Sequence, residues 1–311
     1  VFADATQTAC DWSHAQQSGG SIPLALNAKH ALYNKLVYSS IMEVFGGHVE
    51  YAVSGGAPLD SSIAHFFNGV GLSLLEGYGM TETCAPSSVN PTEGYKIGTI
   101  GLPLQGVTMG VDDEGELCIQ SPAVCAGYPN NPDVTKQQIV DGWLHTGDLG
   151  SIDDDGFVSI VGRKKDLIIT AGGKDGAPGE REVSMMATRV MSKCVMSGER
   201  KPFIASIISL DLEETNLWLE SKGAEQVADL DEASKNPIVR AEVERAVNKA
   251  NELASRAESI RKFEIVPDEF TEENGLVTPS MKARRQAVVE HYRTLIDKVI
   301  YVPRKPEAHA E

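Results

Sequence analysis

The sequence predicts a mixed α/β protein with two domains, and its 311 residues are enough for both. Three observations carry this prediction. Helical apolar spacing alternates with short strands and glycine turns up to residue 97, and short strands separated by Asp-Gly and Glu-Gly turns fill residues 98–163. A third is that residues 164–311 combine a strand with a long amphipathic helix, which is typical of a smaller α+β domain.

The first segment reads as a layered α/β unit. A helix over 28–45 ends at paired glycines, a short buried strand over 48–54 runs into a glycine turn, and Ser61 or Ser62 caps the next helix. A second strand covers "LSLLEGYG" at 72–79. In such units ligands bind at the carboxyl ends of the strands.

Beyond residue 164 we expect a central strand at 201–211 and a helix over 236–263. The apolar residues of that helix recur every three or four positions, and we interpret this stripe as core packing, the alternative being a partner-binding face. The stripe consists of Val239, Val243, Val247, Ala250, Ala254 and Ala257.

The net charge and the spacing of the cysteines limit the classes of function that the chain can have. Acidic residues outnumber basic ones 44 to 28, and this net charge of −16 argues against nucleic-acid binding. A polyanionic small ligand remains compatible if local cations, helix N-termini or a divalent metal offset the field. The five cysteines form no C-x-x-C pair, which favours reduced thiols in a cytoplasmic protein.

The sequence gives no sign of a membrane span or a signal peptide, and it starts without Met, as if entered partway through a longer chain. Peripheral association with the inner face of a membrane stays open, as does the oligomeric state.

The stretch "GYGMTET" at 77–83 carries the chemistry of a nucleotide site. Tyr78 offers a flat face for a base, Thr81 and Thr83 offer hydroxyls for phosphate oxygens, and Glu82 is a hard oxygen ligand of the kind Mg²⁺ takes. The alternative is a plain strand-ending turn whose glycines serve the backbone.

Five further motifs occur with it in order, and together they make the chain resemble the C-terminal portion of an adenylate-forming (AMP-binding) enzyme, in particular a long-chain fatty acyl-CoA synthetase. The match runs from about residue 28 to 290. The six motifs are "VSGGAPL" (53–59), "GYGMTET" (77–83), "GEL" (115–117), "DGWLHTGDLG" (141–150), "GRKKDLIITAGGK" (162–174) and "TPSMKARR" (278–285).

The resemblance implies a domain plan. Residues 1–163 would form the C-terminal part of the large AMP-binding domain, with α/β layers over 1–97 and a β-rich subdomain over 98–163. Residues 164–311 would form the small mobile lid domain, with Lys165 as the hinge.

It also implies a role for the residues of the first motifs. Tyr78 lies against adenine, Thr81 contacts the α-phosphate and Glu82 binds Mg²⁺, with Thr81 and Glu82 counted among the catalytic residues. The glycine loop runs along adenine and the acyl channel. Its nucleotide-binding members are Gly55, Gly56 and Ala57, and Gly79 of the second motif joins them.

The later motifs complete the expected site. Asp148 binds the ribose diol, because a carboxylate can accept hydrogen bonds from both hydroxyls, and Arg163 supports the sugar or the phosphates. Lys174 ends a loop that would face CoA, although "KDGAPGE" departs from the usual pattern there. Lys282 is the implied catalytic lysine of adenylation, which stabilises the negative charge that develops.

One expected part is missing from the sequence: the glycine-rich, Ser/Thr-rich loop ending in lysine that cradles the β- and γ-phosphates. We therefore expect a partial chain of a fatty acid–CoA ligase that uses ATP, Mg²⁺ and coenzyme A with a fatty acid, and we expect it to be inactive by itself. The alternatives are a fatty acyl-AMP ligase that loads a carrier protein, an inactive nucleotide-binding remnant, and a purely structural α/β protein.

Overall fold

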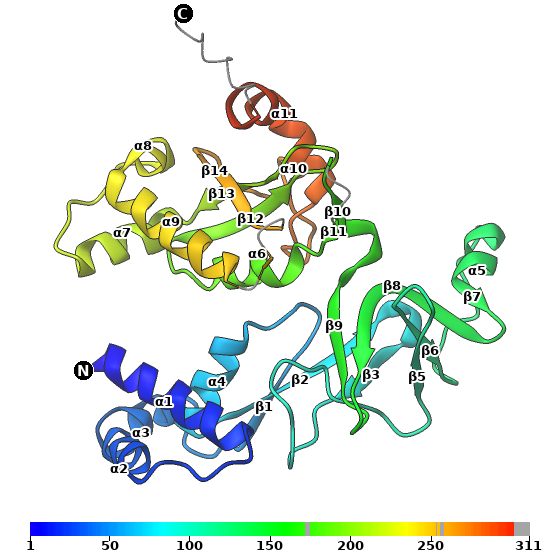
Figure 1. The fold of residues 1–311 in the computed structure, drawn as a ribbon, viewed down its shortest axis with the longest axis horizontal. Helices are drawn as coiled ribbons and strands as arrows, with labels where there is room; N and C mark the ends of the chain where they lie inside the picture. The colour runs from blue at the N-terminus through cyan, green and yellow to red at the C-terminus, as the bar shows by residue number, and fades with distance from the viewer. Residues whose placement is uncertain (172–174, 253, 256–257, 302–311) are drawn as a thin grey trace, which may run out of the picture. The chain divides into compact units, whose positions relative to one another are not determined.

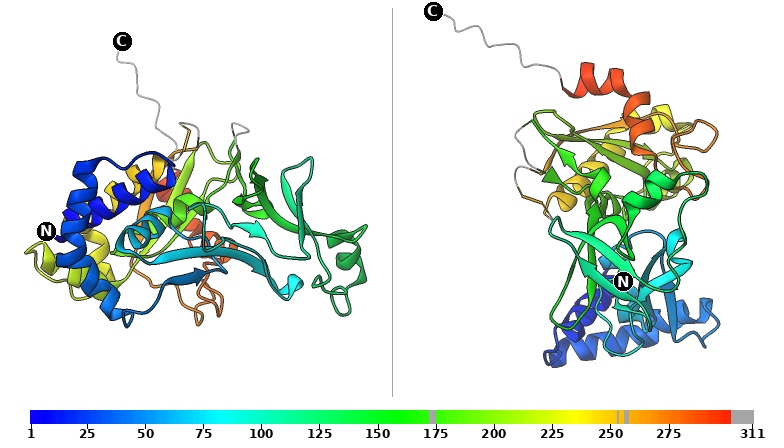
Figure 2. Two further views of the ribbon diagram at one scale, coloured as in Figure 1. Left: turned by 90° about the horizontal axis from the view of Figure 1, so that it is seen from below. Right: turned by 90° about the vertical axis from the view of Figure 1, so that its right-hand side faces the viewer.

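The computed structural model describes residues 1–171, 175–252, 254–255 and 258–301, which form two compact units, Val1–Lys165 and Asp166–Glu311. Each unit is considered by itself. The first carries four helices at one end and two sheets beyond them (Figures 1 and 2). That the second unit moves as a separate domain stays a prediction.

In the first unit, helices precede and flank a small sheet of order β1-β2-β3-β4. The β1–β2 pair is parallel, and the other pairs of this sheet are antiparallel. The elements are α1 (Phe2–Gln17), α2 (Leu24–Tyr33), the π-helical segment Asn34–Tyr38, α3 (Ser39–Val44), β1 (Tyr51–Ser54), α4 (Ser61–Val70), β2 (Ser73–Met80), the 3₁₀ turn Thr81–Thr83, β3 (Ala85–Val89) and β4 (Leu102–Pro103).

The second sheet of this unit has the order β5-β6-β8-β7, and β9 also pairs with β8. It confirms the β-rich segment that the Asp-Gly and Glu-Gly turns predict. Its elements are β5 (Thr108–Val111), β6 (Glu116–Gln120), α5 (Pro132–Gln138), β7 (Ile139–Val140), β8 (Trp143–Ile152), β9 (Val158–Arg163) and the 3₁₀ turn Lys164–Asp166.

The second unit is built on a three-stranded sheet, β12-β13-β14. Its elements are β10 (Ile168–Ile169), β11 (Asp175–Gly176), α6 (Gly179–Met186), β12 (Met191–Ser197), β13 (Ile204–Leu210), α7 (Leu212–Ser221), α8 (Leu230–Lys235), α9 (Pro237–Asn251), β14 (Ile260–Val266), α10 (Arg285–His291), α11 (Arg293–Leu295) and the π-helical segment Ile296–Ile300.

The central position predicted for β13 is confirmed, since every one of its residues is buried. Alternate side chains enter two cores because successive residues of a strand point to opposite faces. Ile204 and Ile208 pack with the α9 side of the sheet, whereas Ala205 and Ile207 pack with the α10 side. Figure 1 shows α9 in yellow and α10 in orange within this unit.

Three local predictions were wrong. The cap of α4 is Asp60, whose side chain accepts from the amides of Ser62 and Ile63, so neither serine takes that role. The strand predicted as buried, β1, is an edge strand on which Val53 is 65% exposed.

The long helix ends at Asn251, well before residue 263, because Ile260–Val266 pairs in parallel with β13 and buries its apolar residues there. The predicted core stripe holds for Val239, Val243, Val247 and Ala250, all buried. Ala254 lies outside the helix, and Ala257 lies outside the described residues.

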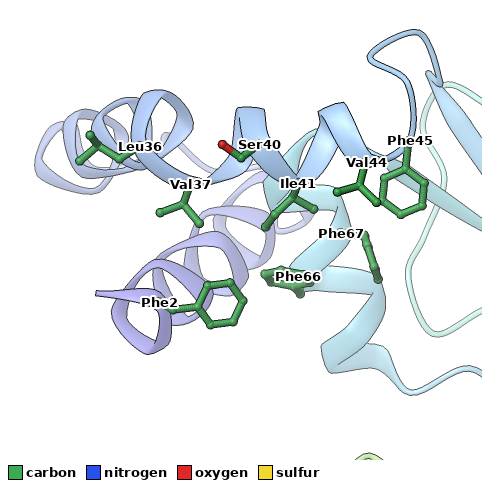
Figure 3. A pocket seen from close by; sticks show the side chains of 9 residues that line it. All are labelled: Phe2, Leu36, Val37, Ser40, Ile41, Val44, Phe45, Phe66 and Phe67. Atoms are coloured by element: carbon green, nitrogen blue, oxygen red, sulfur yellow. The ribbon is translucent and has the colours of Figure 1, made fainter.

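An apolar hollow of about 540 Å³ opens on the helical end of the first unit (Figure 3). Side chains from α1, from α4 and from the helical stretch 36–45 surround it. They are Phe2, Leu36, Val37, Ser40, Ile41, Val44, Phe45, Phe66 and Phe67.

Within the described part of the chain, no helix combines the length and the apolar character that crossing a bilayer requires.

Candidate nucleotide site

Because β1 and β2 pair in parallel, the glycine loop Gly55–Ala57 lies beside β2, the strand that carries Tyr78. Ser54 is paired with Glu76, so the loop that follows β1 begins next to the second half of β2. Glu76 fastens the end of this loop by accepting a hydrogen bond of 3.2 Å from the amide of Leu59. A Cβ at Gly55 would meet the carbonyl oxygen of Gly77 at 3.2 Å, so the close approach of the two segments favours glycine.

The loop itself is exposed over Gly55, Gly56 and Ala57. Gly56 adopts a positive φ of 82°, a region that side-chain-bearing residues rarely occupy. The sequence therefore produces an exposed backbone rim at the carboxyl end of β1, where a flat ligand could approach without meeting side chains.

Tyr78, Asp148 and Arg163 come together from three strands. The Tyr78 hydroxyl donates to Asp148 Oδ2 at 2.5 Å, and Arg163 Nε donates to Asp148 Oδ1 at 2.9 Å. The β8–β9 register pairs Asp148 directly with Arg163. The Asp148 side chain is 6% exposed and that of Arg163 is 63% exposed, so a buried carboxylate lies under a solvent-facing cation.

Burial, reinforced by the hydrogen bond to Asp148, raises the pKa of Tyr78 well above the value of a free phenol. Tyr78 therefore remains a protonated donor at any physiological pH. Its ring also packs against the apolar core of the β5–β9 region, which holds the side chain in place.

The 3₁₀ turn Thr81–Thr83 places its two threonine side chains in different environments. Thr81 is exposed, whereas Thr83 is buried, and its hydroxyl is bonded to the backbone of Met80 and Ala85. Only Thr81 is thus placed to meet a ligand. The predicted phosphate role of the Thr83 side chain does not fit this geometry.

Glu82 presents part of its carboxylate. Its Oε1 accepts a hydrogen bond of 2.9 Å from the hydroxyl of Tyr128, and its Oε2 makes no hydrogen bond to the residues that the structure describes. One fixed carboxylate with a remaining oxygen suits Mg²⁺, which proteins hold through one or two carboxylates while substrate phosphates supply other ligands.

Gly79 allows the backbones of β2 and β3 to approach closely. A Cβ there would lie 2.3 Å from the carbonyl oxygen of Ala85, at a register shift between β2 and β3. Its requirement for glycine comes from this backbone approach, so the structure gives Gly79 a positioning role for Tyr78.

The remaining predicted residues lie at or beyond the end of the first unit. Lys165 is the last residue of that unit, inside an exposed 3₁₀ turn. Lys282 is an exposed residue of the second unit, on a tight loop in which its carbonyl accepts from the amide of Thr278 at 2.8 Å. Lys174 lies outside the described residues.

Sequence reasoning missed the residues that orient the predicted site residues through hydrogen bonds. Tyr128 orients Glu82, Glu76 fixes the glycine loop, and Thr146 Oγ1 accepts from the amide of Asp148 at 3.1 Å. Tyr128 and Glu76 act through contacts that only the folded chain creates, and Thr146, although it lies within the motif "DGWLHTGDLG", acts through a local contact with the Asp148 amide.

The fold is that of an adenylate-forming enzyme. The family model described as "AMP-binding enzyme" matches residues 20–129, and the model described as "AMP-binding enzyme C-terminal domain" matches residues 165–302. The chain belongs to the AMP-binding enzyme family, and its curated relatives are long-chain-fatty-acid–CoA ligases. This confirms the α/β fold class and the resemblance that the six motifs carry.

Among those relatives, the long-chain-fatty-acid–CoA ligase FadD15 of Mycobacterium bovis is 42% identical over 299 residues, which is 96% of this chain and 50% of the relative. Human long-chain-fatty-acid–CoA ligase 1 is 27% identical, over 96% of this chain and 45% of its own. The chain thus spans about half the length of the curated relatives it matches.

Solved structures show the same fold. The adenylation domain of a carboxylate reductase from Mycobacterium chelonae superimposes with a TM-score of 0.65 at 20% identity, covering 94% of this chain and 44% of that one. The o-succinylbenzoate CoA synthetase MenE of Bacillus subtilis, solved with ATP and a magnesium ion, gives 0.58 at 20% identity, covering 80% and 49%.

Proposed function

We propose that the protein to which this chain belongs is an ATP-dependent long-chain fatty acid–CoA ligase. A fatty carboxylate oxygen attacks the α-phosphorus of ATP, pyrophosphate leaves, and an acyl-adenylate forms. The thiol of CoA then attacks the acyl carbonyl, and AMP leaves. The names of the relatives support the reaction class, and one observation supports the site: Tyr78, Asp148 and Arg163, from three separate motifs, form one hydrogen-bonded network.

In this proposal the network binds the nucleoside of the adenylate. The Asp148 carboxylate is fixed from both sides, so it accepts hydrogen bonds from the ribose diol without reorganising. Arg163, largely exposed, faces the sugar or the phosphates. Tyr78 and the Gly55–Ala57 backbone flank the adenine.

In this proposal the 3₁₀ turn Thr81–Thr83 binds the phosphates of the nucleotide. The exposed hydroxyl of Thr81 donates to an α-phosphate oxygen, and Glu82 holds Mg²⁺ through the carboxylate oxygen that Tyr128 leaves open. When bound, Mg²⁺ neutralises the negative charge that builds on the phosphates.

Three lysines complete the proposal. Lys282 bridges the fatty carboxylate and the α-phosphate during adenylation, and Lys165 is the hinge about which the second unit turns. Lys174 belongs to the loop that faces CoA. The division of the chain after Lys165 supports the hinge, and the exposure of Lys282 on a tight loop supports a mobile catalytic cation.

The test is expression of the longer protein that includes this chain, assayed with a long-chain fatty acid, ATP and CoA. We expect AMP, pyrophosphate and acyl-CoA in equal amounts. Lys282→Ala should slow acyl-adenylate formation about 10²–10³-fold, a loss typical of removing one transition-state donor, while thioester formation from supplied acyl-adenylate continues. Lys298→Ala, at an exposed position of the same unit, is the control.

The same assay separates the alternatives. Acyl-adenylate formation without transfer to free CoA would point to a ligase that loads a carrier protein. Nucleotide binding without turnover would point to a remnant, and no binding at all to a structural protein. We propose that the 311-residue chain by itself is inactive, because its sequence holds no phosphate loop; acyl-CoA formation by the purified chain would refute that.

The cellular setting is also a proposal. A cytoplasmic protein with peripheral association at the inner face of a membrane fits the fatty substrate. Flotation of the longer protein with anionic vesicles tests the membrane part.

A further inference from the structure

A second cluster of ligating side chains lies on the β5–β6–β8 sheet, apart from the residues assigned to the nucleotide. Cys118 of β6 and His145 of β8 are direct cross-strand partners, and Asp112 follows β5 in the turn toward β6. Cys118 Sγ lies 3.5 Å from His145 Nδ1, and the same nitrogen lies 3.8 Å from Asp112 Oδ2.

These separations fit a shared metal ion. With usual bond lengths to Zn²⁺, two ligand atoms on a tetrahedral ion lie about 3.4–3.6 Å apart. The two measured distances, 3.5 and 3.8 Å, are close to that value, and the donor atoms of all three residues fall within 4.8 Å of one another. The strand register imposes this closeness, because directly opposed residues project to the same side of the sheet.

The donor set selects the class of ion. One sulfur, one imidazole nitrogen and one carboxylate oxygen suit Zn²⁺ and similar divalent transition metals, whereas Mg²⁺ and Ca²⁺ prefer oxygen ligands throughout. The site therefore differs in chemistry from the carboxylate of Glu82.

A fourth ligand is within reach. Glu116 Oε2 also lies 3.8 Å from His145 Nδ1, although its carboxylate is engaged by the amide of Gly147 at 2.7 Å and by Lys164 at 3.1 Å. A cavity of about 350 Å³ lined by Asp112, Glu116, His145 and Lys164 leaves room for water as the fourth ligand and gives the ion a path of entry.

The local charge also favours a cation. The carboxylates of Asp112 and Glu116 both lie 3.8 Å from His145 Nδ1, and an ion bound there offsets their negative charge. Binding releases the Cys118 thiol proton to solvent, because the thiolate is the form that ligates a metal.

We propose that Asp112, Cys118 and His145 form a binding site for one divalent transition-metal ion of the Zn²⁺ class, with Glu116 or water as the fourth ligand. The proposal stands independently of the ligase activity, since it rests on contacts inside the β-rich sheet.

Cobalt is the probe, because Co²⁺ takes tetrahedral sites and a thiolate ligand gives it a charge-transfer absorption band. The 311-residue chain, freed of metal by chelation, is titrated with Co²⁺, and bound Co²⁺ is then displaced by Zn²⁺. We expect a thiolate band that saturates at one equivalent and disappears with Zn²⁺. Cys118→Ser should abolish the band, and His145→Gln should weaken binding at least tenfold.

Cys125→Ser is the matched control, since that thiol lies on the same unit outside the cluster, and it should bind as the parent does. The absence of a stoichiometric thiolate band in the parent chain would overturn the proposal, and so would a band retained by a folded Cys118→Ser variant. If Cys118→Ser does not fold, Asp112→Asn decides: unchanged Co²⁺ affinity in that variant would count against the site.

Discussion

The hydroxyl of Tyr78 donates a 2.5 Å hydrogen bond to Asp148, joining residues that are 70 positions apart in the chain. This contact links the small mixed sheet β1-β2-β3-β4 to the β-rich sheet of the same unit. It brings two motifs that look like separate turns in the sequence into one hydrogen-bonded network. Arg163 holds the other oxygen of the same carboxylate, so both oxygens of Asp148 are fixed.

Changing Gly79 to Ala should destabilise the first unit. The new Cβ would lie 2.3 Å from a backbone carbonyl oxygen that cannot rotate away, so the strands must separate. We expect a loss of about 1–3 kcal/mol in the free energy of unfolding, measured by urea denaturation. Gly110→Ala is the control, because its Cβ would meet only the Trp143 ring at 3.7 Å; an equal loss in both would contradict the packing argument.

How much of this arrangement the sequence predicts depends on the range of the interactions. The glycine loop, the strand that carries Tyr78 and the β hairpins follow from local patterns, and the structure confirms them. The helix α1 was not predicted, and the helix α9 was predicted twelve residues too long, since nothing local shows that Ile260–Val266 pairs with β13.

The site follows the same division. Tyr78, Asp148 and Arg163 could be named from their motifs, but the supporting contacts of Tyr128, Glu76 and Thr146 could not. Conversely, Thr83 looks like a phosphate ligand in the motif, and only the structure shows that its hydroxyl is occupied by the backbone.

Breaking the Glu182–Arg285 pair should strongly destabilise the second unit. Two hydrogen bonds of 2.6 and 2.7 Å join the carboxylate and the guanidinium, and Glu182 Oε1 also accepts the amide of Met196. Glu182→Ala leaves a largely buried cation unpaired, and we expect a loss of about 3–5 kcal/mol in urea denaturation.

The comparison for that variant is Arg189→Ala, which removes an exposed pair with Glu214 and should cost less than about 1 kcal/mol. Similar losses from the two variants would show that burial does not set the strength of the Glu182–Arg285 pair.

The free energy of unfolding of the first unit should decrease as the pH is lowered, because His65 must then take up a proton. Burial, with a smaller effect of His14, lowers the pKa of His65 from 6.5 to about 4 in the folded protein. The neutral ring is therefore favoured by folding, so its contribution is complete above pH 6.5 and is lost as pH falls toward 4. That contribution is on the order of 3 kcal/mol.

His65→Asn removes this titration while keeping an acceptor near Ser13, whose hydroxyl lies 2.8 Å from His65 Nδ1. Denaturation series at pH 7, 5.5 and 4.5 should therefore show a shallower decline in the variant. Parallel declines in parent and variant would exclude His65 as the source.

Removing the Glu82 carboxylate should uncouple nucleotide binding from magnesium. Glu82→Gln keeps the acceptor for Tyr128 but loses the charge, so Mg²⁺ should no longer strengthen ATP binding. Glu114→Gln, at an exposed carboxylate of the β5–β6 turn, is the control. Fluorescence titrations with and without Mg²⁺ measure the difference, and a Mg²⁺ effect that survives in Glu82→Gln would remove Glu82 from the metal site.

The central claim is that the first unit holds the nucleoside half of an adenylate site around Asp148. Calorimetric titration of the 311-residue chain with AMP tests it most directly, with Asp153→Asn, in an exposed hairpin turn, as the control. We expect weak, saturable binding to the parent and the control, and about ten- to a hundredfold weaker binding to Asp148→Asn, the loss of one charged hydrogen-bonding group. No binding by the parent chain, or the same affinity in Asp148→Asn and the parent, would contradict the claim.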